Sequence, residues 1–404
     1  MAQLSPTIRM SFSSILPSGS QIPPPKQILS DVSREQTQAS GPYPSTREVL
    51  TAAGRWFLDS GIQELSGGVA RYYRCDLGRN ARVSSEITGY AVSAFLFFHR
   101  RSGRTEYLES ALRAARFLTR IAWDAQLGAF AFEYSSNGDQ PPALAYFFDT
   151  GIIIRGLLAA WRVSQQAEFR DTAIAAGRAM LADFSAGGAI HPILALPHKR
   201  PLNYESNWSA APGCYQLKSA MAWYELFELT GEACFLRAYE AALDGAIARQ
   251  RDFLPGDADP NKVMDRLHAY AYFLEGLLPV LNRGDCASLF REGVGRIAAY
   301  LGEIAPLFAR SDVYAQLLRL RLYGKVLGAI PLDKETAARE AHHALAFQLH
   351  SADPGAANGF SFGGRGRELV PFVNPVSTAF CAQALALWDD HEDNTLETHR
   401  HSLI

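Results

Sequence analysis

Cysteine is scarce in this chain, and the few cysteines are widely scattered. They are odd in number, and no two form a CxxC pair: they stand at Cys75, Cys214, Cys234, Cys286 and Cys381. Such spacing indicates neither a disulfide framework nor a zinc site. We therefore expect no metal and no cofactor, and a reducing compartment such as the cytoplasm.

The chain also lacks an excess of either charge and any long apolar run. Its 39 Lys and Arg residues nearly balance 41 Asp and Glu residues. Nucleic acids and acidic membrane surfaces attract strongly basic proteins, so neither is an expected partner. The longest apolar runs, such as Leu277–Leu281, are far shorter than the roughly 20 residues of a membrane span.

Residues 1–44 form a separate segment rich in Ser, Pro and Gln. This segment has no continuous apolar stretch of the kind that a secretory signal needs. Because low hydrophobicity favours disorder, we expect a flexible N-terminal tail on a cytoplasmic protein. A second polar tail is expected at residues 391–404, which leaves residues 45–390 for the folded domain.

Two kinds of helical pattern alternate within residues 45–390. In the segment 105–122, apolar residues such as Leu108 and Leu112 share one helix face, and Arg116 lies on the other. This pattern predicts an amphipathic helix. The segment 151–161 is apolar on almost every side, so its helix must be buried.

Six helices of each kind are expected, in strict alternation. The amphipathic set is expected near residues 47–60, 105–122, 167–183, 232–250, 285–302 and 333–349. The apolar set is expected near residues 86–101, 149–163, 213–229, 264–281, 312–328 and 374–389. Buried helices inside and half-exposed helices outside satisfy this alternation. The sequence therefore predicts an all-α fold, an (α/α)6 toroid of six helical hairpins with inner and outer helix rings.

The links between these helices are of two lengths. From an apolar helix to the next amphipathic one, the link is a short turn with glycine, as at Gly103 and Gly231. In the other direction it is often long, as in residues 61–85, 124–148 and 185–212. The long loops should therefore gather at one end of the toroid, over the N-termini of the inner helices. Long loops on a rigid scaffold usually carry function.

This layout resembles the (α/α)6 toroids of carbohydrate-active enzymes. The resemblance covers residues 45–390 and is architectural, without a shared motif. It extends to the six-hairpin unsaturated glucuronyl hydrolases, polysaccharide lyases, uronyl epimerases and N-acylglucosamine epimerases, and also to terpenoid cyclase and protein prenyltransferase toroids. It implies a fold, and function has to be argued from a site.

Polar, aromatic and titratable residues cluster where the inner helices begin. Glu86 and Asp149 are two of the carboxylates there, and helix capping is an alternative explanation for each of them. Two carboxyl groups across a glycosidic bond are what a hydrolase requires. Burial of Asp149 among aromatic residues would raise its pKa, as a general acid requires.

The densest cluster is the segment 265–272. His268 and Tyr270 are candidate proton-transfer groups, Arg266 is a candidate anion binder, and Asp265 is placed to orient the imidazole. This combination suits abstraction of a proton beside a uronate carboxylate, as in a lyase or an epimerase. A buried structural histidine is the alternative.

Further residues are candidates for binding a sugar. Lys218 is a second candidate anion binder, and Asn374 could supply an amide. Aromatic side chains stack on pyranose faces, and the candidates for this role are Tyr146, Trp208, Tyr215 and Tyr314.

We therefore expect a carbohydrate-active enzyme that acts on a uronate-containing oligo- or polysaccharide as a lyase, epimerase or glycoside hydrolase. One alternative is a non-catalytic toroid that binds a glycan or a protein in a polysaccharide system. Another is an isoprenoid cyclase-like toroid, although the sequence has no DxDD stretch of the kind such cyclases use. A polar cleft would favour the first hypothesis, and a closed apolar tunnel the isoprenoid one.

Overall fold

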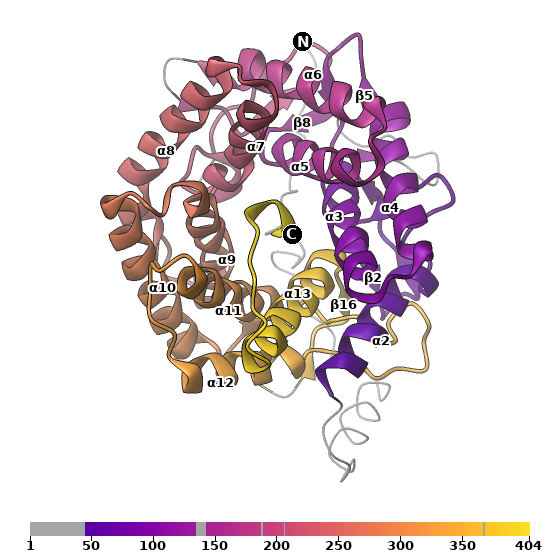
Figure 1. The fold of residues 1–404 in the computed structure, drawn as a ribbon, viewed down its shortest axis with the longest axis vertical. Helices are drawn as coiled ribbons and strands as arrows, with labels where there is room; N and C mark the ends of the chain where they lie inside the picture. The colour runs from indigo at the N-terminus through magenta and orange to yellow at the C-terminus, as the bar shows by residue number, and fades with distance from the viewer. Residues whose placement is uncertain (1–44, 135–142, 187–188, 206, 367) are drawn as a thin grey trace, which may run out of the picture.

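The computed structural model describes residues 45–134, 143–186, 189–205, 207–366 and 368–404. The predicted N-terminal tail, residues 1–44, lies outside them. The described residues contain twelve α-helices, arranged in two concentric rings (Figure 1). The predicted (α/α)6 toroid is confirmed. Within the described part of the chain, no helix is long and apolar enough to cross a membrane.

The inner ring is closed, because each inner helix packs against the next and the last packs against the first. Its members are α3 (Ser85–Ser102), α5 (Phe147–Ser164), α7 (Gln216–Thr230), α9 (Pro260–Gly276), α11 (Ser311–Val326) and α13 (Pro375–Glu392). Their side chains are buried over most of each helix surface, as the apolar pattern predicted. The ring therefore holds one continuous core.

The outer ring carries the amphipathic helices. Its members are α2 (Thr46–Asp59), α4 (Thr105–Phe117), α6 (Ala167–Phe184), α8 (Ala233–Phe253), α10 (Gly284–Ile304) and α12 (Lys334–Leu345). Each inner helix packs on the outer helix that follows it, and α13 packs on α2. The first and last helices of the described chain thus form a hairpin pair across the seam of the ring.

Local sequence explains the helix boundaries. Gly103 and Gly231 end α3 and α7 in the left-handed conformation, at φ 70° and 73°, which glycine adopts without steric cost. Helix α9 starts earlier than predicted, because Asp259 caps it and Pro260 occupies its first turn. It also stops earlier, before Pro279, which lacks the backbone N–H that a continuing helix needs.

Short antiparallel strands join neighbouring long loops, and no pattern in the sequence predicted them. Three-stranded sheets form in the orders β1-β4-β7, β12-β11-β8, β13-β14-β15 and β16-β2-β3, and β5-β6 and β10-β9 are two-stranded. The strands are β1 (Val69–Ala70), β2 (Tyr73–Arg74), β3 (Arg79–Asn80), β4 (Val83–Ser84), β5 (Trp123–Asp124), β6 (Ala129–Phe130), β7 (Glu133–Tyr134), β8 (Leu144–Tyr146), β9 (Ser185–Ala186), β10 (Ala189–Ile190), β11 (Ile193–Ala195), β12 (Arg200–Pro201), β13 (Ala309–Arg310), β14 (Gly363–Arg365), β15 (Glu368–Leu369) and β16 (Phe372–Val373). Strands β4, β8 and β13 run directly into α3, α5 and α11, so the sheets fix the first turns of these inner helices.

The residues after α13 turn back into the centre of the inner ring, where Figure 1 marks the end of the chain. Leu403 and Ile404 are buried there. Arg155 of α5 donates to the carbonyl oxygen of Leu403 at 3.1 Å, and Lys218 of α7 donates to that of Ile404 at 3.3 Å. The segment predicted as a polar tail therefore packs against several inner helices.

Candidate functional site

A pocket of about 510 Å³, which includes the solvent at its mouth, opens at the face that carries the long loops. Its lining comes from these loops and from the inner helices below them. The lining residues are Glu86, Phe132, Tyr146, Phe148, Asp149, Pro192, Trp208, Ser209, Tyr215, His268 and Tyr272. The pocket therefore lies over the starts of the inner helices, the region in which the sequence analysis placed a ligand site.

Two carboxylic acids, Glu86 and Asp149, line this pocket from the first turns of α3 and α5. They are buried, with exposed fractions of 1% and 6%. The side chain of Ser84 caps α3, so Glu86 is not needed for that task. Within the described structure, Oε1 of Glu86 and Oδ2 of Asp149 have no hydrogen-bond partner. Burying a polar atom without a hydrogen-bond partner costs free energy, so these two oxygens are candidates for hydrogen bonds with a ligand.

Burial also changes the ionisation of both acids. It raises the pKa of Asp149 to about 8, although the positive charge of Arg71 opposes the shift. The pKa of Glu86 is raised well above its ordinary value by burial and then by the charge of Asp149. Two neighbouring carboxylates resist ionising together. The pair therefore retains at least one proton at neutral pH.

The cation whose charge lowers the pKa of both acids is Arg71, which is itself buried. Its Nη1 atom lies 3.0 Å from Oε1 of Glu133, and its guanidinium group lies 5.2 Å from the ring centre of Phe132. Arg71 thus moderates the charge of the two acids while it is paired with Glu133. The sequence analysis missed Arg71 and Phe132, because both stand in loops away from the inner-helix starts.

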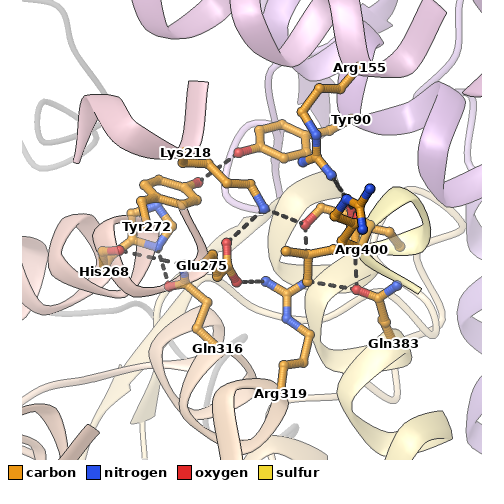
Figure 2. Close-up of polar contacts among 12 residues, drawn as sticks. Tyr90, Arg155, Lys218, His268, Tyr272, Glu275, Gln316, Arg319, Gln383 and Arg400 are labelled. Carbon is orange, nitrogen blue, oxygen red and sulfur yellow. Dashed lines mark hydrogen bonds and ion pairs between the residues drawn. The ribbon is translucent and has the colours of Figure 1, made fainter. Parts of the chain in front are cut away.

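His268 lines the pocket from α9 and is buried. Its Nδ1 atom lies 2.8 Å from Oε1 of Gln316 and 3.4 Å from Oδ2 of Asp312 (Figure 2 shows the contact with Gln316). Burial, the largest cause, lowers the pKa of His268 to about 4. The imidazole is therefore neutral at pH 7, and Nδ1–H donates to Gln316, which leaves Nε2 with a lone pair.

Arg310, at the end of β13, fixes the acids behind His268. This fully buried guanidinium donates to both carboxylate oxygens of Asp312 and, at 2.8 Å, to Asp265. Asp265 therefore pairs with Arg310, and the residues that orient His268 are Asp312 and Gln316. The sequence predicted a contact between Asp265 and His268, which are three positions apart on α9. Instead, Asp265 contacts Arg310 of β13, and His268 contacts Gln316 of α11.

Aromatic rings form much of the pocket wall. Phe132 and Tyr146 have ring centres 4.7 Å apart, and Trp208 and Tyr215 have theirs 5.0 Å apart. At the base, Tyr272 packs edge-on against His268 at 4.4 Å. Flat apolar faces beside polar groups are the usual surroundings of a bound sugar. Of the predicted stacking residues, the pocket thus contains Tyr146, Trp208 and Tyr215.

The other predicted site residues lie elsewhere, and their assigned roles are not supported by their positions. Tyr270 donates to Gln250 at 2.7 Å on the outer side of α9. Arg266 covers the ring of Phe253 at 5.0 Å. Tyr314 stacks on His343 of the outer helix α12, with ring centres 4.8 Å apart.

Lys218 and Asn374 also have structural partners. The Nζ atom of Lys218 lies 2.8 Å from Oε2 of Glu275 in the centre of the ring (Figure 2). Asn374 caps α13, with its Oδ1 atom accepting from the backbone N–H of Val376 at 2.7 Å. Across the described ranges, no three His, Cys, Asp or Glu side chains come together as a metal site.

Comparison with known proteins gives the fold and no family. No family model matches the chain, and no curated protein matches it. Among solved structures, a sugar epimerase from a ruminal bacterium matches with a TM-score of 0.64 at 14% identity, over 84% of this chain and 97% of that one. Cellobiose 2-epimerase from Bacillus thermoamylovorans matches with a TM-score of 0.65 at 13% identity, over 84% and 98%.

An unsaturated glucuronyl hydrolase specific for heparin also matches. Its TM-score is 0.61 at 12% identity, over 87% of this chain and 99% of that one. The predicted resemblance to six-hairpin toroids is therefore confirmed. At these identities the likeness establishes the fold, and the reaction has to be argued from the pocket.

Proposed function

We propose that this protein is a carbohydrate-active enzyme, and specifically a glycoside hydrolase that uses Glu86 and Asp149. The observation that carries the proposal is the pair of buried carboxyl groups in an aromatic-walled pocket, each with an oxygen that has no partner in the described structure. Known toroids of similar fold act on sugars, as their names state, and this supports the same class of substrate.

The shared proton gives the two acids different tasks. In glycoside hydrolysis, a protonated carboxyl group donates to the leaving oxygen, and an ionised one activates water or attacks the sugar. At Asp149, the charge of Arg71 has the largest effect of any charge on the pKa. At Glu86, the charge of Asp149 has a larger effect on the pKa than the charge of Arg71. Because the charge of Arg71 is the largest charge effect on Asp149, we propose Asp149 as the ionised partner and Glu86 as the acid. The sequence alone assigned the acid role to Asp149.

The first experiment is a screen of the purified full-length chain against a panel of glycans, with product chromatography and ultraviolet absorbance. Shorter products without new absorbance support hydrolysis. Absorbance from an unsaturated uronate would instead show a lyase. The variants Glu86→Gln and Asp149→Asn should each lose at least about 100-fold in kcat, whereas Glu335→Gln on the exposed face of α12 should keep full activity.

Leaving-group dependence separates the two roles. Glu86→Gln should recover activity on an aryl glycoside whose leaving group needs no protonation, because only the acid is missing. Asp149→Asn should stay inactive on the same substrate, because the nucleophile or base is missing. Recovery in Asp149→Asn alone would reverse the assignment, and full activity of both variants would refute the proposal.

A second reaction is favoured by His268. A neutral imidazole beside a sugar can remove and return a proton at carbon, as an epimerase must. Two of the matched folds are named as sugar epimerases. Deuterium uptake from D2O at a sugar carbon, with no chain cleavage and with loss in His268→Ala, would establish this reaction instead.

The predicted uronate preference and the two alternative functions differ in how well the pocket supports them. The comparisons leave the uronate preference untested, and the charges around the pocket do not support it. Binding of a glycan without turnover or deuterium uptake would support the non-catalytic alternative. A pocket with two carboxyl groups and a histidine does not suit an isoprenoid.

A further inference from the structure

We infer that this pocket selects an uncharged sugar ring and discriminates against a uronate. The inference rests on the proposed function, because it concerns the substrate class of the same site. It departs from the uronate substrate that the sequence suggested.

The pocket is lined by acids and has no base to balance them. Among the described residues that line it, Glu86 and Asp149 are carboxylic acids, and neither Lys nor Arg is present. His268 lies opposite them as a neutral ring. Recognition of a carboxylate normally uses Arg or Lys, so the counter-ion of a uronate would have to come from the layer behind the wall.

Each cation in that layer already has a carboxylate. Arg71 contacts Glu133 at 3.0 Å, and Arg82 contacts the other oxygen of Glu133 at 3.3 Å. On the side of His268, Arg310 contacts Asp312 at 2.6 Å and Asp265 at 2.8 Å. Turning Arg310 toward a substrate would separate the buried Asp312 from its guanidinium group, and turning Arg71 would leave the buried Glu133 with only the longer contact to Arg82; both changes are costly.

The two residues proposed from sequence as anion binders do not supply the missing charge. Arg266 packs on Phe253 outside the pocket, and Lys218 is paired with Glu275 in the centre of the ring. A uronate would therefore bring a third carboxylate beside Glu86 and Asp149 in a poorly solvated space. Like charges there repel strongly, and one of the three groups would have to remain protonated.

A neutral ring meets none of these costs. Its hydroxyl groups can donate to or accept from Oε1 of Glu86 and Oδ2 of Asp149, the two buried oxygens without a partner in the described structure. Its apolar face can lie against the rings of Trp208 and Tyr146, which line the same pocket. The site thus matches hydroxyl groups and ring faces, and it has nothing to match a carboxylate.

The test compares sugars that differ only at one carbon. Glucose with glucuronate, galactose with galacturonate and mannose with mannuronate form three matched pairs. Each is titrated into the full-length protein at pH 7, with tryptophan fluorescence as the signal and Trp208→Phe as the control that the signal reports this pocket. In at least one pair, the neutral sugar should bind about tenfold more tightly or better. The difference in affinity between the neutral sugar and its uronate should narrow in the double variant Glu86→Gln, Asp149→Asn, because that variant removes the acids that repel the uronate.

Two results would overturn the inference: equal or tighter binding of the uronate in every pair that binds, or no binding of any neutral sugar. The proposed hydrolase activity fails separately. Binding of neutral sugars without cleavage of any glycan would remove the hydrolase and leave the selectivity. Cleavage of glucuronides alone would establish the hydrolase and remove the selectivity.

Discussion

The Nδ1 atom of His268 lies 2.8 Å from Oε1 of Gln316, although the two residues belong to different inner helices, α9 and α11. An amide oxygen can only accept a hydrogen bond, so it holds the proton on Nδ1 and leaves Nε2 as the basic nitrogen. Because Gln316 is uncharged, it orients the imidazole without stabilising its protonated form as strongly as a carboxylate would. Gln316 therefore sets the direction of the His268 ring, whereas burial and the charge of Asp312 have the larger effects on its pKa.

Replacing Gln316 by glutamate should raise the pKa of His268. The new carboxylate would stand against Nδ1 and favour the charged imidazolium. NMR titration of the His268 ring should show a shift of about one pH unit or more. If His268 transfers a proton as a base, the acidic limb of the kcat/KM profile should move to higher pH by a similar amount. A shifted NMR titration with an unchanged profile would remove His268 from the chemistry.

The raised pKa of Asp149 predicts a cost in stability that grows with pH. Below pH 4 the carboxyl group is protonated in the folded and the unfolded chain, and there is no cost. Above the unfolded pKa of roughly 4, the unfolded chain releases its proton first, so stability falls until the pH passes the folded pKa of about 8. Asp149→Asn should remove this fall and stabilise the protein at pH 8 by at least about 1 kcal/mol.

Urea denaturation at pH 5 and pH 8 measures that effect. The gain in Asp149→Asn should be larger at pH 8 than at pH 5. A variant that is less stable than the parent at both values would show that the charged carboxylate stabilises the fold. Loss of activity together with a gain in stability would be the expected sign of a functional acid.

Glu275 joins two buried cations in the centre of the ring. Its carboxylate contacts Lys218 at 2.8 Å and Arg319 at 2.5 Å, and all three side chains are fully buried (Figure 2). Although burial acts to raise it, these two charges hold the pKa of Glu275 below its ordinary value. Glu275→Leu would leave both cations without their carboxylate and should destabilise the fold by about 3–5 kcal/mol.

Lys218→Met should cost less than Glu275→Leu, because Glu275 would keep Arg319 as its partner. Urea denaturation of both variants and of the double variant measures the difference. The double variant is expected to be more stable than Glu275→Leu alone. Equal loss in the two single variants would contradict the view that the carboxylate is the central member.

The chain segment after α13 should stabilise the whole ring. Arg155 donates to the carbonyl oxygens of Arg400 and Leu403, and Arg319 donates to that of Ile404 at 3.2 Å. A stop codon after Asn394 would remove these acceptors from buried guanidinium groups, and Tm should fall by more than about 5 °C. Arg400→Ala removes a partly exposed ion pair with Glu228 and a contact with the ring of Tyr224, but it leaves these carbonyl oxygens in place, so it should lower Tm by much less.

Trp208 should contribute to substrate binding more than to chemistry. It lines the pocket and packs against Tyr215, with ring centres 5.0 Å apart. Once a substrate is known, Trp208→Ala should raise KM about tenfold or more, with a smaller change in kcat. Tyr314→Ala is the comparison, because Tyr314 stacks on His343 away from the pocket. An equal rise of KM in both variants would favour a general loosening of the fold.

The helix rings were predictable because periodicity extends over many residues, and six repeats reinforce one another. The strands were not, since two or three residues carry no measurable period. Glu86, Asp149, Tyr146 and Tyr215 could be found because they stand next to inner-helix starts. Arg71 could not, because its position depends on how a loop folds back over the ring.

Helix geometry alone could have corrected some of the predicted site residues. Tyr270 follows His268 by two positions, so at about 100° per residue it lies on the opposite face of α9. Tyr272, four positions after His268, shares its face and does line the pocket. Lys218 was different: nothing in the sequence showed that the end of the chain would return to the ring centre and surround it with buried polar partners.

The pairing of α2 with α13 has a consequence for the newly made chain. Helix α2 is synthesised first among the described helices, but its packing partner comes more than 300 residues later. The indole N–H of Trp56 donates to the carbonyl oxygen of Gly355, 299 positions away. The part of the apolar face of α2 that packs on α13 therefore stays without its partner throughout most of translation, although Phe57 can already pack against Phe95 of α3. Apolar surface that stays exposed in this way is prone to aggregate, so we expect the emerging polypeptide to need protection until α13 closes the seam of the ring.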